Sequence, residues 1–193
     1  MIHFARLKSV LAGSLLLSAL SCAATDMVRV QTELGEFVVE IETEKAPITA
    51  KNFLRYVDAG AFDGGTFHRA VRLDNQNRDD ILIEVIQGRP ARGAESYGSI
   101  PLERTNETGL KHLDGTISMA RGGPDSASSG IFICINDQPS LDFGAMRNAD
   151  GQGFAAFGRV VEGMDVVRAI QQSPTERENL TPAIQITSAA RVR

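Results

Sequence analysis

The sequence predicts a single, mostly β domain in which many short strands are joined by turns and two helices. Its 193 residues are 42% hydrophobic and 23% charged, which is the composition of an ordinary globular domain. Several short apolar runs are bounded by turn residues, as expected of buried strands. Only two segments show the apolar spacing of an amphipathic helix. These elements suit a closed antiparallel barrel capped at both ends, but the strands alone could equally build a sandwich.

The first predicted elements are a hairpin and a helix. Apolar residues alternate with polar ones around Val28 and again over most of 37–41, with a Leu-Gly turn between them. Pro47 stands at the favoured first position of a helix, and Gly60 ends that helix. The apolar residues of the helix fall on one face and are Ala50, Phe53, Leu54 and Val57.

The middle of the chain alternates predicted strands with polar loops. Thr66–Val71 and Ile81–Gln87 read as strands, and the segment between them is almost wholly polar over residues 73–80, LDNQNRDD. We interpret this polar segment as a solvated hairpin extension, with an arm that contacts substrate as the alternative. The irregular stretch from Gly88 to Leu113 predicts a long surface loop.

The second half predicts the remaining strands and helix. Thr116–Ala120 and Ile131–Ile135 read as buried strands around a loop of Gly, Pro, Asp and Ser, the kind of loop at which proteins bind ligands. Phe154–Val161 is a further strand. A helix whose apolar face carries Met164, Val167 and Ile170 follows and stops at Ser173-Pro174, and a last strand begins near Ile184.

Residues 1–23 have the pattern of a secretory signal peptide. Arg6 and Lys8 precede an apolar run over residues 10–20, and small residues follow it. The run is too short for a transmembrane helix, and a buried N-terminal helix is the competing interpretation. Cleavage at the end of the signal would release a soluble protein, whereas cleavage before Cys22, in a lipoprotein-like sequence, would leave a lipid anchor there. Either outcome predicts export to the periplasm or cell envelope.

Charge and residue types exclude several functions. Loss of the signal removes two of the 20 basic residues and none of the 24 acidic ones, so the net charge moves from −4 to −6. An acidic chain without a basic cluster has no electrostatic attraction to nucleic acid. His68 and His112 are far apart and lack neighbouring ligands, so no metal site is expected. The serines near position 126 lack a nucleophile elbow, and the glycines near position 122 lack the P-loop pattern. Cys134 reads as a small buried hydrophobe.

Ordered motifs over roughly Val28–Arg191 resemble the cyclophilins, a family of peptidyl-prolyl cis/trans isomerases. The motifs are Phe67-His68-Arg69, Ile86-Gln87-Gly88, Gly115–Ala120 with Ser129–Ile133, and Phe157–Val160 with Glu162-Gly163-Met164. The resemblance implies a closed eight-stranded antiparallel β-barrel capped by two α-helices over residues 26–193. It also implies an enzyme that acts as a monomer without a cofactor and rotates X–Pro bonds in peptides and unfolded exported proteins.

The resemblance implies Arg69 as the catalytic residue. Rotation about the peptide bond is opposed by amide resonance worth about 18–20 kcal/mol, and a cation beside the prolyl nitrogen favours the unconjugated form. An arginine suits this role because it stays charged. The substrate-binding residues that the resemblance implies are Gln87 for the peptide backbone, Phe132, Leu141 and Val85 for the proline pocket, Ala120 and Arg121 for the backbone ledge, and Phe154, which stands where the family has a His.

Several positions depart from the family pattern. Gly130 replaces a glutamine, Ile131 a phenylalanine, Ser140 a tryptophan and Glu84 a phenylalanine. These departures leave open a second function, a proline-peptide-binding or chaperone module of the same fold with weak or no catalysis. A third interpretation is an interaction protein that docks a partner through residues 73–80.

Overall fold

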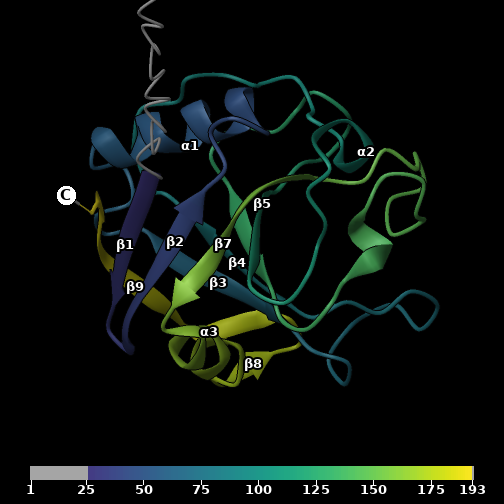
Figure 1. Ribbon diagram of the computed structural model, residues 1–193. Coiled ribbons are helices and arrows are strands. Elements are labelled where there is room, and N and C mark those ends of the chain that lie inside the picture. Colours follow the sequence, from purple (N-terminus) through teal and green to yellow (C-terminus); the bar gives the residue numbers. More distant parts are fainter. Residues whose placement is uncertain (1–25, 193) are drawn as a thin grey trace, which may run out of the picture.

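The computed structural model describes residues 26–192 and shows a closed antiparallel β-barrel (Figure 1). Eight strands follow one another in the order β1-β2-β7-β5-β6-β4-β3-β9, and β9 pairs with β1 to close the ring. The strands are β1 Asp26–Thr32, β2 Gly35–Ile41, β3 Thr66–Val71, β4 Val85–Arg89, β5 Thr116–Met119, β6 Ile131–Cys134, β7 Ala155–Glu162 and β9 Asn179–Arg191. The predicted eight-stranded barrel is confirmed, and the β1–β9 pairing rules out a sandwich.

Two helices cover the two ends of the barrel (Figure 1). Helix α1, Pro47–Asp58, begins with its proline and buries the four apolar residues expected from the sequence. Helix α3, Met164–Gln171, lies at the opposite end and buries Val167 and Ile170. A one-turn helix, α2 Thr105–Thr108, interrupts the long loop before β5. Both capping helices therefore form where the apolar periodicity predicts them.

The barrel interior is the main hydrophobic core. Strand residues that point inward are almost fully buried, among them Phe67, Ile86, Ile117 and Ile133, each 0% exposed. Beneath α1, the ring of Phe53 lies 5.2 Å from the ring of Phe157 and 5.5 Å from that of Phe62. Because the interior is filled with side chains, any substrate site has to lie on the outer face of the barrel wall.

The strand predicted over 81–87 is shorter than expected, since β4 begins only at Val85. Side chains form hydrogen bonds with the backbone N–H and carbonyl groups that a longer strand would use for pairing. The amide of Gln76 bonds both the N–H and the carbonyl of Ile83, and the Arg147 guanidinium donates to the carbonyl of Ile81. Residues 81–84 therefore form an irregular approach to the strand.

The last strand begins at Asn179, earlier than predicted, and a two-residue strand, β8 Thr175–Glu176, pairs with its start. The resulting hairpin turns at Arg177 and Glu178. Among the described residues, no helix has the length and hydropathy needed to cross a bilayer. The predicted signal peptide and Cys22 lie outside the described residues.

Candidate functional site

A β-bulge in β3 sets the direction of Arg69. The ladder with β4 pairs Phe67 with Gly88 and Arg69 with Gln87, so His68 is an extra residue on β3. Phe67 points into the barrel, and without the extra residue Arg69 would point inward as well. Because the bulge reverses the alternation, Arg69 projects from the outer face.

Three neighbouring strands place the predicted site residues on that outer face. Gln87 on β4 pairs with Arg69 on one side and with Phe132 of β6 on the other. Directly paired residues in antiparallel strands share a face, and so do residues two apart along one strand. Val85 and Cys134 therefore lie on the same face as Gln87 and Phe132.

A cavity of about 330 Å³ lies over this face. All eight residues predicted for the site line it: Arg69, Val85, Gln87, Ala120, Arg121, Phe132, Leu141 and Phe154. Sequence positions more than 80 residues apart are thus brought together by strand pairing and by the two loops that follow β3 and β6. Four further lining residues were not predicted for the site: Arg78, Ile83, Arg147 and Asn148.

The floor of the cavity is apolar and rigid. Phe132 is 5% exposed, and the edge of one ring meets the face of the other where Phe132 and Phe154 pack, with 5.2 Å between centroids. Leu141 is held in place by a 3-10 turn, Pro139–Leu141. Cys134 lies beneath, fully buried, and burial raises the pKa of its thiol. These side chains form a closely packed apolar floor beneath the cavity.

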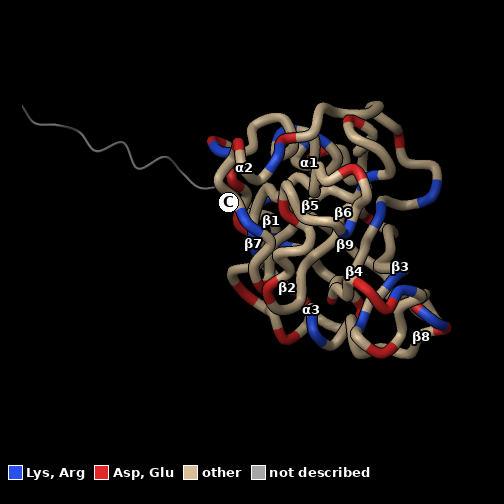
Figure 2. Tube along the Cα trace, turned by 90° about the vertical axis from the view of Figure 1, so that its right-hand side faces the viewer, with Lys and Arg blue, Asp and Glu red and all other residues tan. Residues whose placement is uncertain are grey.

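Arg69 stands at the rim of the pocket with most of its donors already engaged. Its Nη1 donates to Gln87 Oε1 at 3.0 Å. Its Nε and Nη2 both donate to a single oxygen of Glu178, Oε2, at 2.8 and 2.6 Å. Glu178 comes from the β8–β9 hairpin, and Figure 2 shows acidic and basic stretches of chain meeting around β3, β4 and β8. Sequence patterns did not indicate this carboxylate, because it lies 109 residues from its partner.

The side chain of Arg121 is engaged within the protein, whereas the role implied for this residue concerns its backbone. Its side chain is 0% exposed and forms a bidentate ion pair with Asp150, at 2.7 and 2.9 Å. Its Nε donates to the carbonyl of Gly153, and its guanidinium carbon lies 5.1 Å from the centroid of the Phe154 ring. This side chain therefore fastens the 142–153 loop over the pocket, and only its backbone remains available as a ledge.

The positions that depart from the family pattern leave the pocket largely intact. The Glu84 carboxylate turns to the side chain of Asn136, which donates to it at 2.9 Å. A Cβ added at Gly130 would meet the Cβ of Ala120 at 3.5 Å, an ordinary contact. Ser140 contributes its carbonyl, which accepts the backbone N–H of Arg147 at 3.3 Å. Neither Glu84, Gly130 nor Ser140 lines the cavity.

The polar segment 73–80 is solvated along most of its length, but one of its side chains reaches the cavity. Arg78 reaches the cavity and donates to the carbonyl of Arg147 at 2.8 Å. Arg147 in turn donates to the carbonyl of Ile81 at 2.5 Å. The segment and the 142–153 loop therefore interlock at the rim, while none of residues 73–80 is buried. Contact between this arm and substrate stays a prediction.

A serine, a histidine and an aspartate also meet behind the pocket. His112 Nδ1 lies 2.8 Å from Asp142 Oδ1, and His112 Nε2 lies 3.0 Å from Ser118 Oγ. The geometry is that of a hydrolase triad, but Ser118 is 0% exposed and His112 is 1% exposed. A peptide cannot reach this serine, so the three residues brace the wall beneath Phe132, whose ring stacks on His112.

Over residues 26–192, no cluster of His, Cys, Asp and Glu has the makeup of a metal site.

Comparison with known proteins agrees with this geometry. Residues 27–191 match the model of the family described as cyclophilin type peptidyl-prolyl cis-trans isomerase/CLD. A peptidyl-prolyl cis-trans isomerase of Acinetobacter baylyi is 36% identical over 168 residues, which cover 86% of this chain and 82% of that protein. The Escherichia coli peptidyl-prolyl cis-trans isomerase B is 32% identical, over 80% of this chain and 89% of its own length.

Solved structures show the same fold. A cyclophilin-type isomerase from Cryptosporidium parvum superposes with a TM-score of 0.70 at 22% identity, covering 88% of this chain and 98% of its own. The structure of that protein determined in the presence of the dipeptide Ala-Pro superposes with a TM-score of 0.67. The chain therefore belongs to the cyclophilin-type peptidyl-prolyl cis-trans isomerase family.

Proposed function

We propose that this isomerase uses Arg69 as its catalytic cation and that its substrates are exported proteins with X–Pro bonds. The observation that carries the proposal is the position of Arg69 at the rim of the apolar Phe132–Leu141 pocket. A proline ring held in that pocket would place its nitrogen beside a guanidinium. Among residues 26–192, no other group that lines the cavity combines a fixed positive charge with a bond to Gln87.

The chemistry requires only binding and electrostatics. Rotation about X–Pro is opposed by amide resonance, and the nitrogen lone pair localises as the bond twists. A cation beside that lone pair stabilises the twisted state more than the planar one, which is the condition for catalysis. The pocket keeps the ring still while Gln87 and the backbone at Ala120 hold the remainder of the peptide, so that one side of the bond turns against the other. No step calls for a cofactor.

The proposed location is the periplasm or cell envelope. It rests on the signal-peptide pattern of residues 1–23, and slow prolyl isomerisation limits the folding of many proteins. Intact mass measurement of the protein made in a bacterial host would identify the processed N-terminus. A mass that includes acyl chains on Cys22 would establish a lipid anchor, whereas an unprocessed chain in the cytosol would contradict export.

The test of the catalytic assignment is an isomerase assay on a capped Ala-Pro peptide, followed by NMR exchange between the cis and trans forms. Arg69→Ala should lower kcat/KM by about 10²–10³-fold. Its fold should persist because the side chain is 30% exposed and its removal opens no core cavity. Arg69→Lys keeps the charge but not the planar contacts with Glu178 and Gln87. Its kcat/KM should therefore lie between the values of the wild type and of Arg69→Ala. Near-normal turnover by Arg69→Ala would overturn the assignment.

A second candidate function is peptide binding without useful turnover. One observation favours it: the Glu178 carboxylate partly neutralises Arg69. The same exchange experiment separates the two, because a binding module would shift the peptide resonances on titration without accelerating exchange between isomers.

A further inference from the structure

Four arginines line the pocket, and three of them are matched by carboxylates. Arg69 pairs with Glu178 at 2.6 Å. Arg78 pairs with Asp80 at 2.6 Å, and Arg121 pairs with Asp150 at 2.7 Å. Each of these three arginines therefore already has a carboxylate of the protein as its partner.

Arg147 differs, because its hydrogen-bond partners are neutral. Its Nη1 donates to the carbonyl of Ile81 at 2.5 Å and to the amide oxygen of Gln76 at 3.4 Å. No carboxylate among the described residues forms an ion pair with it. Burial, together with the positive charges of Arg78 and Arg69, lowers the pKa of its guanidinium, and the carboxylates of Glu178 and Asp80 offset this shift only in part. The rim of the pocket thus holds a half-buried cation in surroundings that favour an added negative charge.

Asn148, the next residue, presents an unused donor at the same place. Its Nδ2 is buried and meets no acceptor among the described residues, although the side chain lines the cavity. Buried donors without a partner are rare because each costs free energy. A guanidinium and an amide N–H are both donors to a carboxylate, and here they belong to successive residues that line one cavity.

The protein holds this pair of donors in a defined position. Arg147 is fixed through Ile81, and the carbonyl of Arg147 accepts from Arg78, so that two loops brace each other. Both loops end at the apolar pocket, since Ile83 and Leu141 line the same cavity as Arg147. An anion recognised here would therefore sit within one or two residues of a bound proline.

We propose that Arg147 and Asn148 form a carboxylate-binding subsite, so that the preferred substrates are peptides with Asp or Glu flanking the X–Pro bond. The inference rests on the proposed function, because the subsite has meaning only if prolines enter the adjoining pocket. Its failure is distinguishable, since an isomerase without this preference would still turn over neutral peptides.

The test compares hexapeptides of the form Ala-Xaa-Ala-Pro-Xaa-Ala with acetylated and amidated ends, which removes the terminal charges. One Xaa is Asp, Asn or Lys and the other is Ala, so that both sides of the proline are sampled with a neutral isostere. Exchange between isomers is followed by NMR, without a coupling protease. Asp at one of the two positions should raise kcat/KM by about three- to tenfold over Asn, and Lys should lower it.

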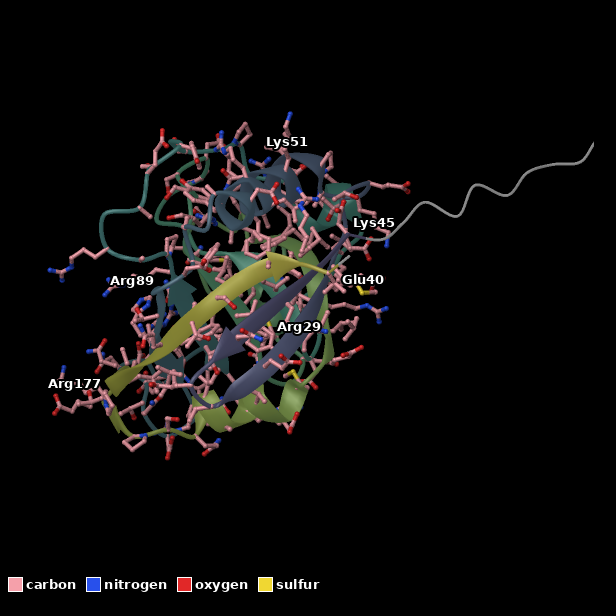
Figure 3. The ribbon with its side chains drawn as sticks, turned by 90° about the vertical axis from the view of Figure 1, so that its left-hand side faces the viewer. Arg29, Glu40, Lys45, Lys51, Arg89 and Arg177 are labelled. Atoms are coloured by element: carbon pink, nitrogen blue, oxygen red, sulfur yellow. The ribbon has the colours of Figure 1, made fainter. Side chains whose placement is uncertain are left out.

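Three variants assign that preference. Arg147→Gln should abolish the Asp-over-Asn ratio, whereas Arg147→Lys should keep most of it, because the lysine retains the charge while losing the guanidinium contacts with the arm. Arg29→Gln removes one exposed charge from β1, on the face drawn in Figure 3, and should leave the ratio unchanged. Raising the salt to 1 M should shrink the wild-type ratio, since screening then acts within about 3 Å.

Three results of these measurements would contradict the proposals. If neither Asp peptide exceeds its Asn isostere, the subsite does not exist. If the preference survives Arg147→Gln, or disappears equally in Arg147→Lys, recognition by the Arg147 charge is wrong. If no peptide is turned over at all, the failure lies with the proposed function instead.

Discussion

Substitutions of Glu178 can distinguish two effects of this carboxylate on Arg69: its negative charge and its role in holding the guanidinium in position. Both bonds from Arg69 end on one oxygen of the carboxylate, Oε2, at 2.8 and 2.6 Å. A glutamine can place its single amide oxygen at the same point and accept the same two bonds. Glu178→Gln therefore removes the negative charge with little change in geometry, while Glu178→Ala removes both the charge and the anchor.

The expected effects of the two substitutions have opposite signs. A prolyl nitrogen on the free edge of the guanidinium would lie about 7 Å from the carboxylate, where a unit charge contributes about 1–2 kcal/mol at an effective dielectric constant of 20–40. Only the fraction of charge that localises on the nitrogen responds to this field. We therefore expect Glu178→Gln to raise kcat about two- to fivefold. Glu178→Ala should lower kcat about tenfold, because Arg69 is then held by Gln87 alone.

The assay is NMR exchange on the capped Ala-Pro peptide, with kcat and KM measured separately. Glu176→Gln is the matched control: it is the same substitution in the same hairpin, at an exposed side chain, and should leave both constants unchanged. Glu178→Gln should also cost about 1–2 kcal/mol of stability, since a half-buried cation loses its partner. If both Glu178 variants lower kcat equally, the carboxylate does not oppose the cation. If neither changes kcat, Glu178 does not act through Arg69.

Two further predictions concern the layer beneath the pocket. Cys134→Ser should cost roughly 1–3 kcal/mol in the free energy of unfolding by denaturant, because a hydroxyl would be buried among apolar side chains, and kcat should change little. Rapid reaction of Cys134 with a thiol reagent in the native protein would contradict its burial. Acidification should destabilise the fold, because burial lowers the pKa of His112 below its ordinary 6.5, so that below about pH 6.5 the unfolded chain binds a proton that the folded one does not. The loss should approach about 1.4 kcal/mol per pH unit for this group, and His112→Gln should flatten the slope; an unchanged slope would refute the assignment.

Much of the fold follows from local patterns in the sequence. The period of the apolar residues predicts both capping helices, and runs such as Ile131–Ile135 predict the central strands with errors of one residue. Closure of the barrel does not follow from them, because it depends on pairing between β1 and β9, which lie at opposite ends of the domain. That step came only from resemblance to a family. The shortened β4 could not be predicted either, since distant side chains from Gln76 and Arg147 occupy its backbone groups.

The candidate site, like the fold, was predictable only in part. The residues proposed to face a proline could be named because motifs preserve their order, and all of them line one cavity. The partners that surround them were not, because Glu178, Asp150 and Arg147 come from loops without a recognisable pattern.

These unpredicted loops determine the electrostatics of the site. Glu178 and Asp150 match two of the arginines at the pocket, and Arg147 alone lacks such a partner among the described residues. The motifs therefore identify the family and its reaction, because the proposed catalysis relies on the same cation and pocket for any X–Pro peptide. Under the proposed carboxylate subsite, substrate preference depends instead on which charges remain unmatched at the rim. For this chain, we expect loop substitutions to change which prolines are turned over, and substitutions on the β3–β4–β6 face to change whether any are.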